Sequence, residues 1–161
     1  MSVDRDTFKH TLGSWASGVT IVTSQHAGER MGMTVSAFSS VSLDPPLVLV
    51  CADKASNTNA LIHASRAFTV NLLAREQSAL SSLFADKKRE GIRFDGLDCK
   101  TGATGCPRIP GALASLDCTV RDVVDAGDHI LYVGSVEAAA IDAEREPLVY
   151  WRGGYQKLTP L

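Results

Sequence analysis

Five hydroxyl side chains gather within nine residues of this sequence, at Thr34, Ser36, Ser39, Ser40 and Ser42. They offer a ligand neutral hydrogen-bond donors and acceptors without a large charge. Most of them alternate with apolar residues, which is the pattern of a strand with one polar and one buried face. The pattern swaps at Phe38 and Ser39, which indicates a bulge or bend. An exposed, Ser/Thr-rich strand face fits the same spacing.

The apolar partners of these hydroxyls predict the buried face, at Met33, Val35, Ala37, Val41 and Leu43. A double-proline turn follows, and the run 47–52 is apolar on both faces, so we expect it to lie in the core. Ser56 or Asn57 can cap a helix that continues to about Ser65. Such a helix presents free N–H groups and a positive dipole end to an anion, and Lys54 precedes it.

The remaining elements follow from hydrophobic periodicity and turn residues. A first helix capped by Asp4 or Asp6 carries apolar residues at Phe8, Leu12 and Trp15, and another spans about 76–84. Further strands are expected at 19–23, 67–72, 112–124, 129–140 and 148–151. The segment 91–110 predicts a loop with one short strand near Phe94. Turns at 26–29 and 125–128 favour hairpins.

Composition limits the function classes. The chain has 161 residues, which fits one domain over 1–161, with 45% apolar residues and a net charge of −2. That charge excludes an electrostatic footprint for nucleic acid or an anionic membrane. No apolar run approaches the roughly 20 residues of a membrane helix, and the polar start shows no signal peptide. We therefore expect a cytoplasmic protein.

Common catalytic and cofactor motifs are absent from the sequence. The four cysteines at 51, 99, 106 and 118 have no C-x-x-C spacing and no paired histidines, so we expect no metal site and reduced thiols. No G-x-G, G-x-S-x-G or H-E-x-x-H occurs. Six or seven strands in hairpins with two or three short helices predict a mainly β fold, a small closed or split antiparallel barrel with helices at its edges.

The order of several segments resembles the short-chain flavin reductases, the NAD(P)H-dependent components of two-component flavin monooxygenases. The resemblance rests on GVTIVT (18–23), GMTVSAFSSVSLDPPLVLVC (32–51), K-x-S-N-T (54–58), FTVNLL (68–73), GDHILYVGSVEA (127–138) and LVYWRGGY (148–155). It implies an FMN-binding split β-barrel with a six-stranded Greek-key sheet, a homodimer, FMN or FAD, and NADH or NADPH as co-substrate. It also implies a separate monooxygenase that receives reduced flavin.

The resemblance further implies which residues touch the flavin. They are Met33, Thr34, Val35, Ser36, Ala37, Phe38, Ser39, Ser40, Cys51, Ala52, Lys54, Ser56, Asn57, Thr58, Phe84 and Arg89. Of these, Thr34, Ser36 and Ala37 are expected near the ring, whereas Phe84 and the basic run 87–89 border the site. A helix-end core residue and a solvated turn are equally good interpretations of the last two.

On the nicotinamide side the resemblance implies His129 as the catalytic residue, through the match of G-D-H to residues 127–129. It would position the carboxamide or help protonate reduced flavin. Tyr150, Arg152 and Tyr155 would cover the ring or contact the pyridine nucleotide, although they also fit an aromatic plug of the barrel, with Trp151.

Other functions remain open at this stage. A non-catalytic, electron-carrying flavoprotein on the same fold is the principal alternative. An oxidase of a phosphorylated pyridoxine-type substrate lacks basic residues for a second phosphate, and a Ser- or Cys-dependent hydrolase has no motif.

Overall fold

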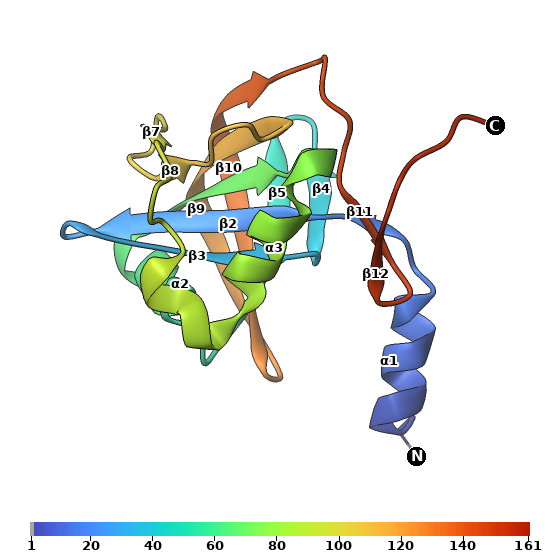
Figure 1. Ribbon diagram of the computed structural model, residues 1–161. Helices are drawn as coiled ribbons and strands as arrows, with labels where there is room; N and C mark the ends of the chain where they lie inside the picture. The colour runs from blue at the N-terminus through green and yellow to red at the C-terminus, as the bar shows by residue number, and fades with distance from the viewer. Residues whose placement is uncertain (1) are drawn as a thin grey trace.

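The computed structural model (Figure 1) describes residues 2–161 and is dominated by β-strands. The strands are β1 Ser17–Gly18, β2 Thr20–His26, β3 Glu29–Val35, β4 Phe38–Ser42, β5 Leu47–Asp53, β6 Ala67–Leu72, β7 Lys100–Thr101, β8 Pro107–Arg108, β9 Ala114–Ala126, β10 His129–Ile141, β11 Val149–Trp151 and β12 Gly154–Gln156. The helices are α1 Arg5–Gly13, α2 Asn57–Ser65, α3 Ser78–Ala85 and the 3₁₀ segments η1 Arg75–Gln77 and η2 Lys87–Ile92. No helix within residues 2–161 is long and apolar enough to cross a membrane.

One antiparallel sheet carries the fold, with the strand order β3-β2-β6-β9-β10-β5-β4. The sheet has seven strands, within the six or seven that the residue pattern predicts and one more than the resemblance implies. The consecutive strands β3 and β4 lie at its opposite edges, yet Met33 of β3 and Phe38 of β4 pack into the same core cluster. The sheet is therefore strongly curled, as Figure 1 shows.

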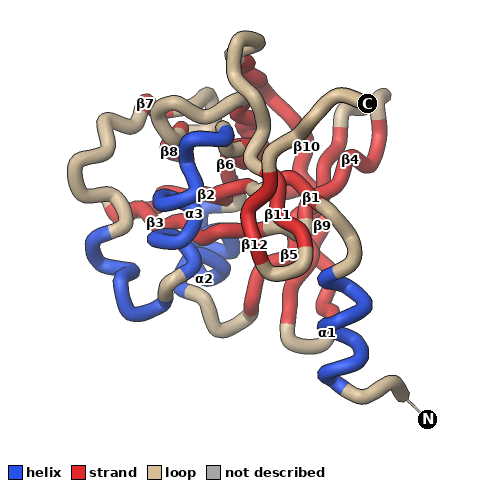
Figure 2. The backbone as a smooth tube through the Cα atoms, turned by 45° about the vertical axis from the view of Figure 1, so that its right-hand side comes forward, coloured by secondary structure: helices blue, strands red, loops and turns tan. Residues whose placement is uncertain are grey.

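The sheet is buried on both faces near β2. Val22 joins an inner cluster with Val50, Phe68 and Tyr132, and α2 contributes Ile62 to it. Neighbouring Ile21 points the other way, since successive side chains of a strand alternate, and packs with Phe84 of α3 in a second cluster. Helices α2 and α3 thus cover separate parts of the sheet and bring their ends toward β3 (Figure 2).

Much of the predicted element order is confirmed. Strand β6 has the predicted bounds, α2 is capped by Ser56, and Asp4 caps α1. The predicted helix at 76–84 consists of η1 followed by α3. Strand β9 continues to Ala126, so the predicted turn at 125–128 is limited to the two residues between β9 and β10.

Several expectations for the central stretch are wrong. The chain breaks at Ser36–Ala37 rather than at residues 38–39, and the bulge lies between Ser40 and Ser42. Val41 in β4 and Leu43 just after it are 52% and 93% exposed, because neither side chain packs against a core cluster within residues 2–161. Strand β5 is not buried on both faces: Val48, Val50 and Ala52 are buried and the residues between them are half-buried.

Two further corrections concern the chain outside the main sheet. Helix α1 buries none of its residues, so its apolar positions do not face the core, and Trp15 beyond it is 78% exposed. No strand forms near Phe94. The short strands of this region are β7 and β8 instead.

The loop 100–110 is fastened to the sheet by one buried carboxylate. Asp117 of β9 is fully buried and accepts hydrogen bonds from Thr69 Oγ1 (2.9 Å), Ala103 N (2.6 Å) and Arg108 Nε (3.1 Å). Gly102 lies so close that a Cβ there would stand 2.3 Å from Asp117 Oδ1. This network positions a loop that has little secondary structure of its own.

Candidate functional site

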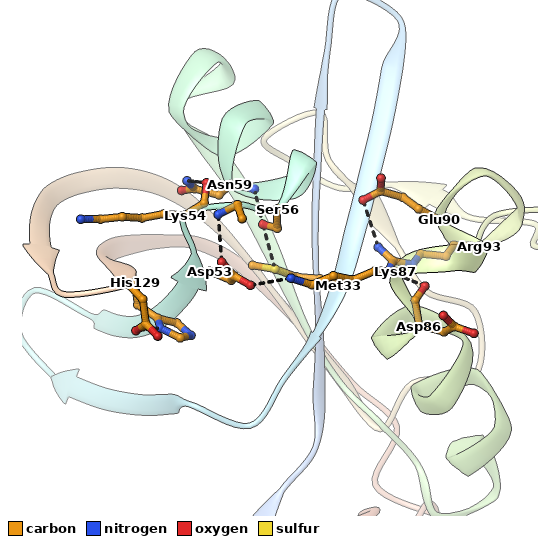
Figure 3. Close-up of polar contacts among 12 residues, drawn as sticks. Met33, Asp53, Lys54, Ser56, Asn59, Asp86, Lys87, Glu90, Arg93 and His129 are labelled. Carbon is orange, nitrogen blue, oxygen red and sulfur yellow. Dashed lines mark hydrogen bonds and ion pairs between the residues drawn. The ribbon is translucent and has the colours of Figure 1, made fainter. Parts of the chain in front are cut away.

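A cavity of about 360 Å³ lies where β3, the end of β5, the start of α2 and the end of α3 meet (Figure 3). Its lining residues are Met33, Thr34, Asp53, Ala55, Ser56, Asn57, Phe84, Ala85, Lys87, Glu90 and Arg93. We call it the anion cavity, for the reasons that follow.

The N-terminus of α2 opens into this cavity. Ser56 is the N-cap, and its Oγ accepts a hydrogen bond from Asn59 N (3.0 Å) while it donates to Met33 Sδ (3.4 Å). The amides of the first helical turn have no intrahelical partner, and the helix dipole favours negative charge there. The Thr58 hydroxyl in that turn is buried without a hydrogen-bond partner in residues 2–161.

Two cations add positive charge to the cavity. Arg93 is only 4% exposed, and it donates to Gly32 O (2.8 Å), Asp86 O (2.9 Å) and Glu90 Oε1 (3.3 Å). Its Nε has no hydrogen-bond partner among the described residues. Burial lowers the pKa of Arg93. Lys87 donates to Asp53 Oδ2 (2.9 Å), and this bond holds the pKa of Asp53 below its ordinary value.

His129 stands beside this cavity. It is the first residue of β10 and is paired in register with Asp53, so both side chains lie on the same face of the sheet. Its Nδ1 is 2.7 Å from Asp128 Oδ1, and this contact lowers the pKa of Asp128. The His129 side chain is 45% exposed, so its outer edge is accessible.

A second cavity of about 500 Å³ lies beyond the break between β3 and β4. It is lined by Leu12, Gly13, Trp15, Ser17, Ser36, Ala37, Phe38, Ser39, Leu49, Cys51 and Tyr150. The aromatic and aliphatic members suit a flat apolar ring, and the exposed serines suit its polar edge. Burial raises the pKa of Cys51, so its thiol is neutral at pH 7. We call this the ring cavity.

Most of the residues predicted for the site line one of the two cavities. Met33, Thr34, Ser56, Asn57 and Phe84 line the anion cavity, and Ser36, Ala37, Phe38, Ser39, Cys51 and Tyr150 line the ring cavity. The Thr34 hydroxyl donates to Ser81 O (2.6 Å), which leaves it only an acceptor role toward a ligand.

Other predicted site residues are placed elsewhere. Val35 and Ala52 are buried in the core, while exposed Ser40 and Arg89 line neither cavity. Lys54 Nζ pairs with Asp125 (2.7 Å) outside the anion cavity.

The C-terminal hairpin does not join either core cluster of the sheet. The Arg152 guanidinium lies 4.5 Å from the Trp151 ring centre, and both side chains are exposed. Tyr155 packs against Tyr150, and its hydroxyl is 3.0 Å from Ser81 Oγ. The expectation of Trp151 as a plug is therefore wrong.

Sequence reasoning missed Asp53 and Glu90, and it considered Arg93 only, with Arg89 and Arg152, as a candidate contact for the 2′-phosphate of NADPH. The first ends an apolar strand, where a single acid carries little signal. Glu90 flanks the basic run 87–89, which predicts a solvated turn, and Arg93 lies in the segment 91–110, which predicts mainly a loop.

Comparisons of the whole chain with known proteins bear on its function. Residues 12–159 match the family model described as a flavin reductase like domain. The reductase subunit HsaB of a flavin-dependent monooxygenase from Mycobacterium tuberculosis is 38% identical over 160 residues, covering 98% of this chain and 84% of that protein. An FMN reductase (NADH), SmoA, from Agrobacterium fabrum is 38% identical over 152 residues, covering 94% and 85%. The solved structure of the NADH:FAD oxidoreductase SgcE6 from Streptomyces globisporus has a TM-score of 0.92 and 34% identity, covering 99% and 96%.

Proposed function

We propose that the two cavities together hold the flavin. The premise is that this chain belongs to the flavin reductase-like family and is an NAD(P)H-dependent flavin reductase. The main support for this proposal is that the two cavities lie on either side of the break between β3 and β4. Met33 and Thr34 line the anion cavity, and Ser36 to Ser39 line the ring cavity only two residues later. A single ligand with an anionic end and a flat ring spans both.

The flavin phosphate lies at the anion cavity in this proposal. The free amides at the start of α2, the unpaired Nε of Arg93 and the flexible ammonium of Lys87 are suitable donors for phosphate oxygens. FMN and FAD both carry a phosphate at the same distance from the isoalloxazine ring, so the same hydrogen-bond donors serve either flavin.

The isoalloxazine ring lies against Phe38, Cys51 and Tyr150. The Ser36 hydroxyl, which makes no hydrogen bond within residues 2–161, is a donor or acceptor for its polar edge. When bound, the flavin supplies the ring that accepts a hydride from reduced nicotinamide. The protein's task is to hold two rings in contact, and such orientation contributes roughly 7–11 kcal/mol to lowering a bimolecular barrier.

His129 serves the nicotinamide side. Its half-exposed ring is anchored through Nδ1 by Asp128, so Nε2 is the atom that faces a ligand. A neutral imidazole held in this way carries its proton on Nδ1, so its Nε2 accepts a hydrogen bond from a carboxamide N–H, while an imidazolium can deliver a proton from Nε2 near reduced flavin. Tyr150 is the member of the C-terminal hairpin that reaches the ring cavity, and Arg152 and Tyr155 border it.

The active assembly is a homodimer of split barrels with a separate monooxygenase as its partner. Helix α1 extends away from the sheet in Figures 1 and 2 and buries no residue, although isolated helices of nine residues are marginal in water. Exposed Trp15 and Leu43 add apolar surface that a second copy would cover. The sheet closes into a barrel where β3 approaches β5, and the whole chain acts as one domain.

Two substitutions test the placement of the rings. Ser36→Leu should abolish flavin binding with the fold intact, whereas Thr101→Leu, at an exposed hydroxyl on β7, should leave flavin affinity unchanged. His129→Ala should lower turnover with NADH more than it lowers flavin affinity. Fluorescence titration measures binding, and NADH oxidation measures turnover. Unchanged flavin affinity in Ser36→Leu would remove the strand break from the site.

A further inference from the structure

Every cation that lines the anion cavity is already paired with a carboxylate that lines the same cavity. Lys87 is paired with Asp53, and Arg93 is paired with Glu90. The cavity therefore contains two positive and two negative side chains. An incoming phosphate meets donors whose charge is largely compensated before it arrives.

The two ion pairs differ in mobility. Arg93 is buried and bound to the backbone carbonyls of Gly32 and Asp86, so its guanidinium is fixed in place. The Lys87 side chain is 74% exposed and bonded only to Asp53, so its ammonium can turn to another acceptor within the cavity.

Asp53 cannot follow Lys87. Its Oδ1 accepts a hydrogen bond from Ala55 N (2.8 Å), which fixes the carboxylate at the junction between β5 and α2. The hydrogen bond from Lys87 lowers the pKa of Asp53, and an aspartate is ionised at neutral pH even without that bond. When Lys87 turns away, the negative charge of Asp53 stays in the lining of the cavity, close to Ser56 at the start of α2 (Figure 3).

We propose that Lys87 exchanges Asp53 for the flavin phosphate, and that the carboxylate of Asp53 then repels the phosphate and keeps flavin affinity moderate. This proposal rests on the proposed function, since it needs the phosphate at the anion cavity. The negative charge of Asp53 repels the negative phosphate, and this repulsion lowers flavin affinity without removing any hydrogen-bond donor from the cavity. The consequence is faster release of reduced flavin, which a reductase must hand to another protein.

The test compares FMN with riboflavin, which has the same ring and no phosphate. Dissociation constants are measured by flavin fluorescence at low salt for the wild type, Asp53→Asn and Glu146→Gln. Glu146 forms an exposed ion pair with Arg75 far from the anion cavity, so its substitution controls for the change in net charge. Asp53→Asn should bind FMN roughly 2- to 5-fold more tightly, as expected for a partly exposed charge interaction, with riboflavin unchanged.

The expected gain should shrink in high salt, because salt screens exposed charges. Equal tightening of FMN and riboflavin, or weaker binding of FMN by Asp53→Asn, would overturn the proposal. Should Asp53→Asn fail to fold, Lys87→Gln provides the same comparison: FMN should bind more weakly and riboflavin as before, and equal effects on both would refute the exchange. A wild-type protein that binds neither flavin would refute the flavin site itself.

Discussion

Replacement of Asp117 by Asn should strongly destabilise the fold without changing the lining of the anion cavity or the ring cavity. Asp117 is fully buried and receives hydrogen bonds from donors on β6, β8 and the loop 100–110. Burial alone would raise the pKa of Asp117, but the hydrogen bonds from Arg108, Ala103 and Thr69 outweigh it and lower the pKa. The amide of Asn presents an N–H toward donors that need an acceptor.

The size of the effect follows from this geometry. Removing one partner of a buried ion pair costs about 3–5 kcal/mol, and the partial exposure of Arg108 (26%) favours the lower end. For a chain of this length each kcal/mol lowers Tm by roughly 2–4 °C, so a loss of about 3 kcal/mol corresponds to roughly 6–12 °C. Glu146→Gln, at the exposed pair with Arg75, should cost less than about 1 kcal/mol.

Thermal and urea unfolding followed by circular dichroism provide the assay. Because the pKa of Asp117 is lower in the folded state, its stabilisation is present above the pKa of an unfolded aspartate and is lost as the pH falls through the folded value. The difference between wild type and Asp117→Asn should thus be constant from about pH 5 to 8 and shrink below about pH 4. A loss below about 1 kcal/mol at pH 7, or a difference that does not change in acid, would refute this account of the network.

Two other predictions concern the site and the assembly. Gly32→Ala places a Cβ 2.8 Å from Phe84 Cε1 and should weaken both flavin binding and stability. Gly134→Ala places a Cβ 2.5 Å from Phe68 Cζ and should reduce stability by about 1–3 kcal/mol, while the folded protein keeps its flavin affinity. Fluorescence titration and urea unfolding distinguish the two variants, and equal flavin affinities would show that Phe84 does not belong to the site. Leu43→Asp puts a charge on the exposed apolar surface next to β4 and should shift the proposed dimer to monomer in light scattering, whereas an unchanged mass would exclude this surface from the interface.

Local signals predicted the elements well. Alternation over 67–72 and the cap at Ser56 each depend on neighbouring residues, and both elements have the expected bounds. The hydroxyl-rich stretch, by contrast, was expected to be one strand with a bulge or bend at Phe38 and Ser39, whereas it forms two strands, β3 and β4, separated at Ser36–Ala37.

Long-range features were beyond local reasoning. Alternation predicted that Val41 and Leu43 would be buried, but burial depends on which strand lies opposite, and β4 has become an edge of the sheet. The anion cavity depends on contacts between residues far apart in sequence: 34 residues separate Asp53 from Lys87, and 61 separate Arg93 from Gly32, whose carbonyl holds its guanidinium. No local spacing encodes such pairs, so the acidic residues of the site emerged only from the folded structure.

The most direct test of the central claim is oxidation of NADH and NADPH, followed at the nicotinamide absorbance, with FMN, FAD or riboflavin added. The account predicts oxidation that depends on added flavin, and the fastest combination identifies both the nicotinamide and the flavin that the protein prefers. Absence of flavin-dependent oxidation with every combination would contradict it.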